Sequence, residues 1–345
     1  MKVMHVLYSV VFTGAEHVVA QIIESFRAVP DMEMFYCSRE SEEVRSALAE
    51  RDIRYVPVTD LTVRELKAVI DREKPDIIHA HDMRASFVSA LCCGNIPLVA
   101  HIHNNAFDAR GLSPKSVAYL LAGCKAKHII WVSDNAFNGY KFHSLFRKKS
   151  IVLKNILGTK QIFARKAQDP NTYDFDVIYV GRLTYPKDPE RLVRVCEIMK
   201  REKPDVKFGV VGTGEMEDTV KALAKELNVE DNMEFLGYQV NPMKMVSDSK
   251  AMLLTSRWEG IPMCALEAMA LGTPVVSTPV GDMGDLVDSG VTGYLCAGDE
   301  ELAKSLLKIV NDPAHREELS EATLEKFAKI NDENAYREAI ARLYP

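Results

Sequence analysis

Apolar stretches alternate with amphipathic stretches along almost the whole chain. The first apolar stretch, Val3–Val10, precedes a helical pattern from about Ala15 to Phe26, and the same alternation then recurs. This alternation is typical of βαβ units, which build parallel sheets covered by helices. Further strands are predicted at Met34–Cys37, Tyr55–Val58, Ile77–His81, Leu98–His103, Ile129–Val132, Val177–Val180, Lys207–Val211, Met233–Leu236, Ala251–Leu254 and Pro274–Ser277.

A polar segment, Gln168–Phe175, interrupts the alternation and is predicted to link two domains. The length of 345 residues also favours two domains over a single core. We therefore expect one α/β domain over residues 1–165 and a second over residues 166–329. The segment Arg72–Asp76 recurs as Arg201–Asp205 before another strand. That repetition fits either a shared helix-to-strand connection, since proline ends a helix, or two similarly built domains.

Composition narrows the class of protein. A hydrophobic content of 47% and a charged content of 27% describe a soluble globular chain, and the net charge of −6 gives no overall case for binding nucleic acid. Seven cysteines without a C-x-x-C pair favour reduced thiols in the cytoplasm. No apolar stretch approaches the roughly 18 residues of a membrane span. The apolar N-terminus is interpreted as a strand, not as a signal peptide.

A loop in the second half carries cations that suit a phosphorylated ligand. Arg182 and Lys187 follow the strand Val177–Val180, and Pro189 then opens a helix. Cations at a strand end and before a helix N-terminus suit a polyanion such as a diphosphate. On their own, the two side chains would equally fit ordinary solvated cations of a loop.

Glycine patterns exclude two classes of nucleotide-binding enzyme. Gly212-Thr213-Gly214 follows a predicted strand, but Glu217 stands where G-x-G-x-x-G needs its third glycine. A dinucleotide-dependent dehydrogenase is therefore disfavoured. Gly-Lys-Ser/Thr is absent from the chain, which excludes a P-loop kinase.

Two glutamates flank the start of a predicted helix that ends at Gly272. Glu259 lies in the loop after the strand Ala251–Leu254, and Glu267 lies one to two turns into the helix. The first N–H groups of this helix, around Gly260–Met263, would be free to meet an anion. Because phosphate would repel Glu259, its predicted partner is a hydroxyl donor such as a sugar. Glu267 would accept from a ribose diol.

Three stretches of the second half closely resemble retaining family 4 glycosyltransferases of the GT-B fold: GRLTYPKDPERL, VVGTGE and EGIPMCALEAMALGTPVVSTPVGDMGDLV. The first half is similar more loosely. Thr13–Glu16 resembles the family's glycine loop, PDIIHAHD resembles its fourth strand, and LVAHIHN resembles the strand that ends in the active-site histidine. The resemblance implies two Rossmann-like, doubly wound domains facing across a cleft that closes over the donor. It also implies that a C-terminal helix within residues 330–345 packs back on the first domain.

The resemblance further implies roles for the matched residues. Arg182 and Lys187 would hold the diphosphate, Glu267 the ribose, and Glu259 the donor sugar, while His103 would line the sugar site. The implied catalytic residues are Glu259, His103, Arg182 and Lys187. The residues implied in binding the nucleotide sugar are Gly14, Arg182, Lys187, Gly212, Ile261, Pro262, Met263 and Glu267, where backbone N–H groups at 261–263 would meet the sugar and β-phosphate. Ala15 departs from the family's second glycine, and Lys154–Ile156 and Gly281–Asp285 depart near the linker and acceptor.

The expected function is therefore hexosyl transfer, with retention, from a nucleotide diphosphate sugar to a hydroxyl of a glycan or lipid-linked acceptor. The family's commonest base favours a UDP-sugar, and no metal or other cofactor is expected. The setting would be cell-surface polysaccharide synthesis in the cytoplasm or at the inner membrane face. The alternatives are a nucleotide-sugar 2-epimerase on the same fold and a binding subunit without activity. A glycan phosphorylase is disfavoured because no lysine stands out for pyridoxal.

Two H-x-H pairs offer a rival chemistry. His79 and His81 end one predicted strand, with Asp82 adjacent, and His101 and His103 end another. The period of two places each pair on one face of its strand. A zinc site, and with it a metallohydrolase, is therefore an alternative.

Residues 136–168 hold eight Lys or Arg and no Asp or Glu. Aromatic residues are interleaved with these cations, at Phe137, Tyr140, Phe142, Phe146 and Phe163. A basic stretch with apolar side chains suits the surface of an anionic membrane. It equally suits a solvated face or part of an acceptor site.

Overall fold

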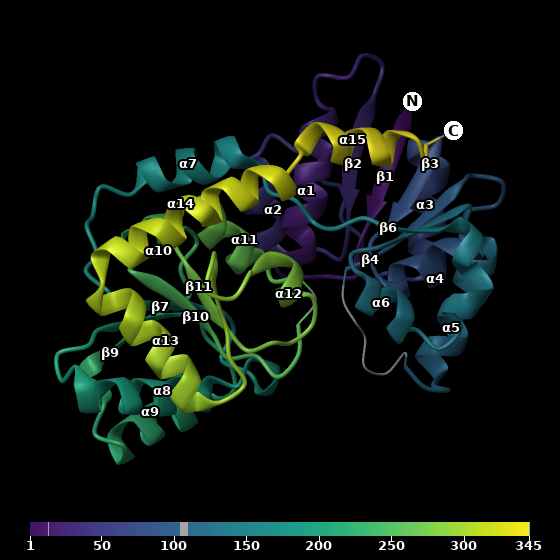
Figure 1. The fold of residues 1–345 in the computed structure, drawn as a ribbon. Helices are drawn as coiled ribbons and strands as arrows, with labels where there is room; N and C mark the ends of the chain where they lie inside the picture. Colours follow the sequence, from purple (N-terminus) through teal and green to yellow (C-terminus); the bar gives the residue numbers. More distant parts are fainter. Residues whose placement is uncertain (13, 104–109, 260, 345) are drawn as a thin grey trace. The chain divides into compact units, whose positions relative to one another are not determined.

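The computed structural model describes residues 1–12, 14–103, 110–259 and 261–344. The chain divides into two compact units (Figure 1). One consists of Met1–Ile156 with Asp332–Pro345, and the other of Leu157–Asn331. The two units are described separately below. In the described ranges, no helix combines the length and apolarity that crossing a bilayer requires.

The first unit contains a six-stranded parallel sheet with the strand order β2-β1-β3-β4-β5-β6. Its strands are β1 (Lys2–Val6), β2 (Glu33–Cys37), β3 (Ile77–Ala80), β4 (Leu98–Ile102), β5 (His128–Trp131) and β6 (Ser150–Val152). Its helices are α1 (Gly14–Phe26), α2 (Glu42–Ala49), α3 (Val63–Glu73), α4 (Met83–Cys92), α5 (Pro114–Lys125), α6 (Asp134–Gly139) and α15 (Glu333–Ala341).

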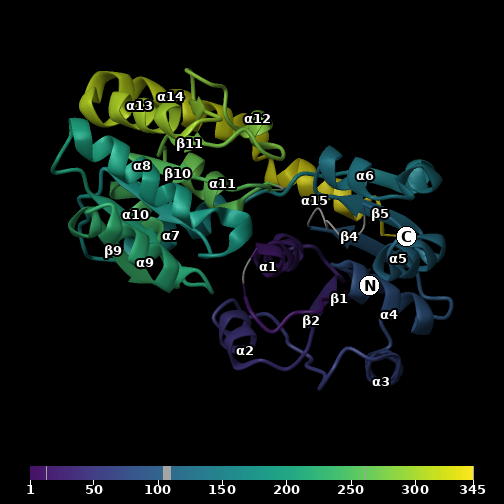
Figure 2. The same ribbon diagram turned by 90° about the horizontal axis from the view of Figure 1, so that it is seen from below.

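The two faces of the first sheet carry different side chains. Met4, Val6 and Ile78 belong to an apolar core that includes residues of α3, α4 and α5. Successive strand residues point to opposite faces, so His5 and His79 face the other way. Figure 2 shows α4 and α5 on one side of these strands and α1 and α15 on the other. The face turned towards α1 and α15 is therefore rich in histidine at its centre.

The C-terminal segment is anchored on this histidine face. Helix α15 contacts α1. The Tyr344 ring, just after α15, lies 6.0 Å from the Phe26 ring of α1. Its hydroxyl is 2.8 Å from Nδ1 of His79. An aromatic contact and a buried hydrogen bond thus hold the end of the chain against the first unit.

The second unit repeats the architecture, with the strand order β12-β11-β10-β7-β8-β9. Its strands are β7 (Val177–Val180), β8 (Phe208–Val211), β9 (Met233–Gly237), β10 (Ala251–Leu254), β11 (Val275–Ser277) and β12 (Gly293–Leu295). Its helices are α7 (Thr159–Gln168), α8 (Pro189–Glu202), α9 (Glu217–Glu226), α10 (Met243–Asp248), α11 (Met263–Ala270), α12 (Met283–Leu286), α13 (Asp299–Asn311) and α14 (Pro313–Ile330).

Alternation along β7 builds a core on each side of the second sheet. Val177 and Tyr179 belong to the core formed with α8, α9 and α13. Ile178 belongs to the core formed with α7, α10, α11 and α14. The predicted α/β class with two parallel sheets is confirmed.

The predicted domain boundary is wrong by one helix. The division falls between Ile156 and Leu157, not after residue 165, and the expected linker Gln168–Phe175 lies inside the second unit. The reason is that Ile162 of α7 packs into the core around α10 and α11. Burial of this side chain ties α7 to the second sheet, and sequence polarity does not reveal it.

Two strand predictions also need correction. Tyr55–Val58 forms only isolated bridges, Tyr36 with Tyr55 and Arg39 with Val58, and no named strand. β1 ends at Val6, earlier than the predicted Val10. Beyond Val6 the Leu7 N–H still donates to the Cys37 carbonyl of β2 at 3.0 Å, but the Tyr8 N–H donates to the Asp82 carboxylate at 2.7 Å, so the chain leaves the sheet there.

The basic stretch 136–168 belongs to both units of the chain. It is divided at Ile156 between the two units. Phe137, Tyr140 and Phe146 are buried in the first core, at most 8% exposed. Most of the interleaved aromatic residues therefore have a structural role, and apolar insertion into a membrane loses its support.

The anchoring of the C-terminus predicts a measurable stability effect. Replacing Tyr344 by Phe removes the hydroxyl that bonds His79 and leaves a buried ring nitrogen unpaired. We expect the free energy of unfolding to fall by about 1–3 kcal/mol. Urea titration followed by near-ultraviolet circular dichroism measures this change.

Tyr336→Phe is the matched control. Tyr336 is also buried and lies on α15, but its hydroxyl has no hydrogen-bond partner among the described residues. Its removal is expected to leave the urea midpoint unchanged or slightly raised. Equal losses in both variants would contradict the proposed anchoring bond.

Candidate functional site

The loop after β7 carries the two predicted cations. Arg182 is exposed, and its carbonyl oxygen accepts a hydrogen bond from the Tyr179 hydroxyl at 3.1 Å. The Leu183 N–H donates to the Thr213 carbonyl at 2.9 Å. The loops after β7 and β8 are thus joined backbone to backbone. These hydrogen bonds fix the backbone at Arg182, from which its exposed side chain extends.

Gly212 has a packing role in this junction. Its φ is +130°, and a Cβ there would lie 2.0 Å from the Gly181 carbonyl oxygen. No side chain fits at that distance, so glycine is required for the approach of the two loops. The predicted contact of Gly212 with a ligand stays a prediction.

Lys187 and Glu259, which lie far apart in the sequence, meet directly. The Lys187 ammonium pairs with Oε1 of Glu259, and the Ser256 hydroxyl donates to the same oxygen at 2.6 Å. The two charged side chains are only 21% and 11% exposed. Partial burial strengthens such a pair because water screens it less. The structure therefore brings these two predicted residues together at the carboxyl ends of β7 and β10.

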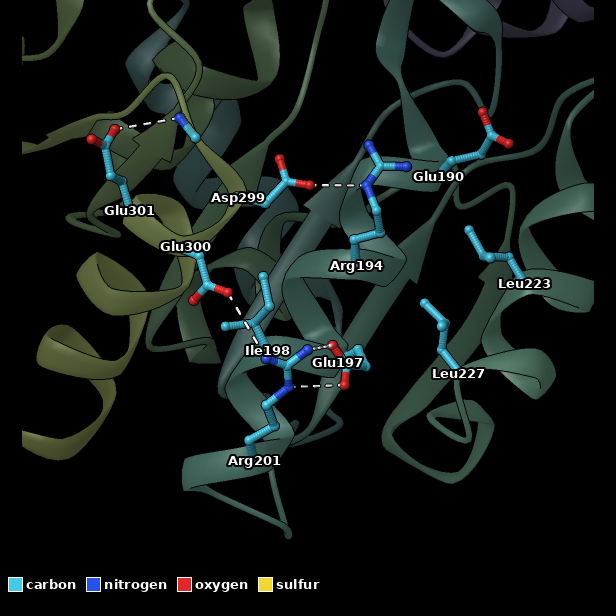
Figure 3. A pocket seen from close by; sticks show the side chains of 11 residues that line it. Glu190, Arg194, Glu197, Ile198, Arg201, Leu223, Leu227, Asp299, Glu300 and Glu301 are labelled. Atoms are coloured by element: carbon cyan, nitrogen blue, oxygen red, sulfur yellow. Dashed lines mark hydrogen bonds and ion pairs between the residues drawn. The ribbon is translucent and has the colours of Figure 1, made fainter.

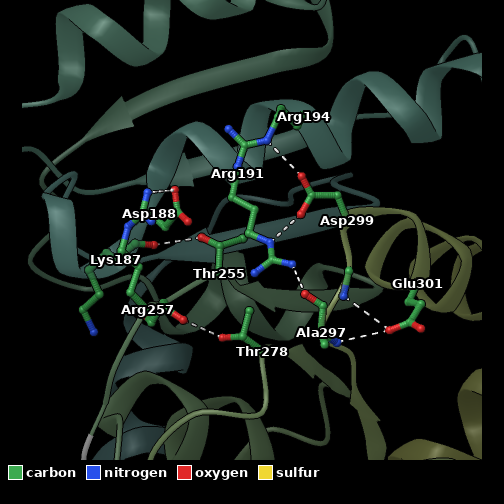
Figure 4. A network of polar contacts seen from close by, with 12 residues as sticks. Lys187, Asp188, Arg191, Arg194, Thr255, Arg257, Thr278, Ala297, Asp299 and Glu301 are labelled. Atoms are coloured by element: carbon green, nitrogen blue, oxygen red, sulfur yellow. Dashed lines mark hydrogen bonds and ion pairs between the residues drawn. The ribbon is translucent and has the colours of Figure 1, made fainter.

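Further side chains tie the same loops, as Figure 4 shows. The Arg257 guanidinium pairs with Asp188 at 2.9 Å, and the Thr255 hydroxyl donates to the Lys187 carbonyl at 2.9 Å. The Thr278 hydroxyl, after β11, donates to the Ser256 carbonyl at 2.7 Å. Sequence reasoning missed these residues. They could have been identified from their position near Lys187 and Glu259, in loops at the ends of neighbouring strands.

Helix α11 starts inside the segment Gly260–Met263, where its free N–H groups were predicted. Pro262 is the residue before the helix, and Met263 is its first residue. The first intrahelical bond runs from the Ala265 N–H to the Pro262 carbonyl at 3.1 Å. The N–H groups of Met263 and Cys264 precede that bond and remain available to an anion. Proline has no N–H, so the predicted backbone donors at 261–263 reduce to Ile261 and Met263.

The end of α11 is as predicted, since Gly272 has a φ of +74° just after the helix. Two residues of the predicted loops, Thr13 and Gly260, lie outside the described residues. Gly14 is the first residue of α1, and a Cβ there would meet nothing within 4 Å. Gly14 is therefore not required by packing, which leaves room for a ligand to approach the backbone.

Glu267 lies on α11 and is partly buried. Burial raises the pKa of its carboxyl to about 7, while the charge of Arg165 on α7 lowers it. Near neutral pH the side chain is thus close to equal populations of acid and carboxylate. Only the carboxylate can accept hydrogen bonds from both hydroxyls of a diol.

His103 belongs to the first unit and follows β4. Its Nε2 lies 2.9 Å from Nδ1 of His81. Burial lowers the pKa of His103 to about 3, so the ring is neutral. As a neutral ring, it can take part in hydrogen bonds but carries no charge.

The H-x-H residues form part of a larger group. Two sets of three histidines have ligand atoms within 4.8 Å of one another: His5 with His79 and His81, and His81 with His101 and His103. Sequence reasoning missed His5. It comes from β1, where it pairs in register with His79 of β3, and sequence alone does not show the register.

A hollow of about 720 Å³ lies elsewhere on the second unit, along α8, α9 and the start of α13 (Figure 3). Four of its charged side chains form ion pairs, Arg201 with Glu197 at 2.6 Å and Arg194 with Asp299 at 2.9 Å. No predicted site residue lines it. We therefore assign the candidate site to the strand-end loops, not to this hollow.

Comparison with known families matches both halves of the chain. The model described as Glycosyltransferase Family 4 matches residues 12–153, and the model described as Glycosyl transferases group 1 matches residues 160–326. A Mycobacterium tuberculosis protein named glycogen synthase is 24% identical over 79% of this chain and 69% of its own length. A Bacillus anthracis protein named N-acetyl-alpha-D-glucosaminyl L-malate synthase is 27% identical over 79% of this chain and 76% of its own.

Solved structures share the fold. Anabaena HepE, in a structure described as a complex with UDP-glucose, has a TM-score of 0.86 at 20% identity, with 99% of this chain and 98% of that chain covered. Staphylococcus aureus TarM has a TM-score of 0.79 at 12% identity, with 99% of each chain covered. The two sheets, the matched families and these neighbours lead to one conclusion: the chain is a glycosyltransferase enzyme and belongs to the family 4 glycosyltransferases of the GT-B fold.

Proposed function

We propose that the enzyme transfers a hexosyl group, with retention of configuration, from a UDP-sugar to a hydroxyl of a glycan or lipid-linked acceptor. The observation that carries this proposal is the Glu259 oxygen shared by Lys187 and Ser256, beside the start of α11. A cation, a carboxylate and free helix amides in one place suit a ligand with both phosphate and hydroxyl groups. The UDP-glucose complex of HepE supports uracil as the base and a hexose as the sugar.

The proposed chemistry is stabilisation of a leaving diphosphate. The bond between the anomeric carbon and the diphosphate oxygen breaks, the acceptor hydroxyl oxygen bonds to that carbon and releases its proton, and negative charge develops on the diphosphate oxygen. Exposed Arg182, Lys187 and the first amides of α11 would meet this charge. Glu259 holds Lys187 and keeps its second oxygen for a hydroxyl of the donor sugar. Cations of the protein would thus take the role of a metal, which fits the expected metal independence.

Names of the relatives support a hydroxyl acceptor and a biosynthetic role. One relative is named for L-malate, and another, from Staphylococcus aureus, is a poly(ribitol-phosphate) alpha-N-acetylglucosaminyltransferase. The acceptor of this enzyme is proposed to be a glycan or lipid-linked precursor of a cell-surface polysaccharide, in keeping with the expected cytoplasmic location. A 2-epimerase would return a UDP-sugar inverted at C2 and would need no acceptor, so release of UDP that increases when an acceptor is added separates the two activities.

A stepwise assay tests the proposal. Nucleoside diphosphates and then their sugars are screened by thermal shift, and proton NMR of the product reports its anomeric configuration. UDP and UDP-hexoses are expected to raise the melting temperature most. An inverted product would overturn retention, and stabilisation by another base alone would overturn the uracil assignment.

Lys187→Ala is expected to lower turnover roughly 100- to 1,000-fold, because a preorganised cation at the leaving group is lost. Hydrolysis of UDP-glucose, with water as acceptor, measures the rate, and the melting temperature monitors the fold. Lys221→Ala is the matched control, because Lys221 pairs with Glu217 on the exposed surface of α9. Full activity in the Lys187 variant would refute the assigned site.

The raised pKa of Glu267 predicts pH-dependent binding of UDP. As pH falls through about 7, the carboxylate takes up a proton and loses its capacity to accept from both ribose hydroxyls. UDP affinity, measured by titration calorimetry, is expected to weaken in that range. Glu267→Gln should bind more weakly at high pH and lack the inflection. The phosphate of UDP titrates equally with both proteins, so the difference between the two pH profiles of UDP affinity reports the titration of Glu267. Parallel profiles would contradict the role of Glu267.

Contact with a membrane, if the acceptor is lipid-linked, is proposed to rest on charge alone. Phe137, Tyr140 and Phe146 are in the core, whereas cations such as Lys148 remain exposed. Sedimentation with anionic vesicles is expected at low salt and should be lost at high salt. Neutral vesicles are the control. Binding that persists at high salt would show apolar insertion instead.

A further inference from the structure

Asp188, which lies between Lys187 and helix α8, has an unusual backbone conformation. Its φ is +46° and its ψ is +57°, in the left-handed region that residues other than glycine adopt uncommonly. Asp188 is buried, with 5% of its surface exposed. The other described residues besides glycine that have a positive φ are all exposed: Asp31, Asp52, Lys74 and Asn228. A buried residue in this conformation needs a local cause.

Capping of helix α8 is not that cause. Asp188 is the residue before the helix, where an aspartate normally has an extended backbone and accepts from N–H groups of the first turn. The Asp188 side chain makes no such bond within α8, all of which lies in the described ranges. Its carboxylate instead accepts from the Arg257 guanidinium at 2.9 Å. Asp188 thus forgoes a capping bond and pairs with the loop after β10.

Arg257 holds the chain on both sides of Lys187. Its Nη2 donates to Oδ1 of Asp188, and its Nε donates to the Tyr185 carbonyl at 3.2 Å. Its backbone N–H donates to the Pro186 carbonyl at 2.8 Å. The guanidinium also lies over the Tyr185 ring, 4.5 Å from its centroid. One residue therefore fixes the backbone before Lys187 and the side chain after it.

This arrangement determines where the Lys187 ammonium lies. Glu259, with which the ammonium pairs, follows Arg257 by two residues in the same loop. A lysine side chain is flexible, so the place of its ammonium depends on how its backbone is held. A different φ and ψ at Asp188 would turn Lys187 relative to helix α8, because these two dihedrals set the direction of the chain. The ammonium would then move away from the Glu259 carboxylate.

We propose that Asp188 and Arg257 are positioning residues for Lys187: their ion pair holds Asp188 in the left-handed conformation and thereby places the Lys187 ammonium on Glu259. The effect of the pair on turnover rests on the proposed function, whereas the placement of the ammonium does not. The competing explanation is an ion pair that only stabilises the fold. Such a pair would not account for the strained backbone, since an extended Asp188 could cap α8 instead.

Asp188→Gly separates placement from stability. Glycine adopts a positive φ without strain but has no carboxylate for Arg257. Lost pairing and relieved strain affect stability in opposite directions, so the melting temperature is expected to change by less than about 4 °C. Turnover of UDP-glucose hydrolysis should fall roughly tenfold, because a displaced cation stabilises the leaving diphosphate less well. The KM should change less than about twofold, since Arg182 and the amides of α11 still bind the ground state.

Full turnover in Asp188→Gly would overturn the role of the pair. A fall in turnover accompanied by a larger loss of melting temperature would show that the pair only stabilises the fold. Asp188→Asn is the conservative variant, because asparagine tolerates the left-handed conformation and its amide oxygen can accept from Arg257. It should retain most of the turnover, and a loss equal to that of the glycine variant would contradict the proposal.

Arg194→Met is the matched control. It removes an ion pair of the same length, 2.9 Å to Asp299, from helix α8. Arg194 lies outside the candidate site, so its replacement should change neither the turnover nor the placement of Lys187. A tenfold loss in this variant as well would show that turnover responds to any lost ion pair of α8, and would overturn the specific role of Asp188.

NMR of the full chain labelled with ¹⁵N-lysine measures the placement directly. The Lys187 ammonium, assigned by its loss in Lys187→Ala, should give a signal protected from exchange, because it is 21% exposed and paired with Glu259. Asp188→Gly should remove this protection. Arg257→Met breaks the pair from the other side and should do the same, which keeps the test available if the glycine variant does not fold. An unchanged signal in both variants, or no protected signal in the wild type, would overturn the proposal.

Combining Asp188→Gly with Lys187→Ala tests whether the pair acts through Lys187. The double variant should hydrolyse UDP-glucose as slowly as Lys187→Ala alone, since an ammonium that is absent cannot be displaced. A further loss in the double variant would show that the pair acts by another route. If the lysine signal responds as expected but the wild type does not turn over UDP-glucose, the placement stands and the proposed function fails. If the signal responds while turnover does not, the role of the placement in turnover is refuted.

Discussion

The candidate site depends on one shared oxygen atom. Oε1 of Glu259 receives both the Lys187 ammonium and the Ser256 hydroxyl, and this joins the loops after β7 and β10. Partly buried charges are stable only when paired, so neither side chain is free to turn into solvent at low cost. The loops are thereby held in place before any ligand arrives. A site organised in advance does not have to reorganise as charge develops during the reaction.

The two glycines predicted to bind the nucleotide sugar, Gly212 and Gly14, differ in how tightly the surrounding atoms pack against them. At Gly212 a side chain would collide with the Gly181 carbonyl, so glycine is fixed by the packing of two loops. At Gly14 a side chain would meet nothing within 4 Å, and packing gives no reason for glycine. Both looked alike in the sequence. Only the backbone geometry separates a position that needs glycine for the fold from one where glycine leaves space beside the chain.

How much the sequence could predict depended on whether the signal was local. β7 and β10 were predicted at their observed bounds, because an uninterrupted apolar stretch that ends in a polar loop is a local pattern. Glu259 and Lys187 were found through their loops, but their direct contact was not, since it joins positions far apart in the chain. The domain boundary was misplaced because the only buried residue of α7, Ile162, does not reveal which sheet it packs against. His5 was missed because the pairing of β1 with β3 is a property of the sheet.

The histidine face of the first unit and the charged loops of the second unit differ in charge. Under the proposed function, a diphosphate would need positive charge, which Arg182 and Lys187 of the second unit would supply, and Glu259 pairs with Lys187. In the first unit, deep burial lowers the pKa of His5, His79, His81, His101 and His103 and keeps all five rings neutral. A neutral ring must still choose which nitrogen carries the proton, and in water both tautomers interconvert freely. The contacts of His81 with His5 and His103, each 2.9 Å, couple that choice across three rings, so one ring cannot change its tautomer without the other two.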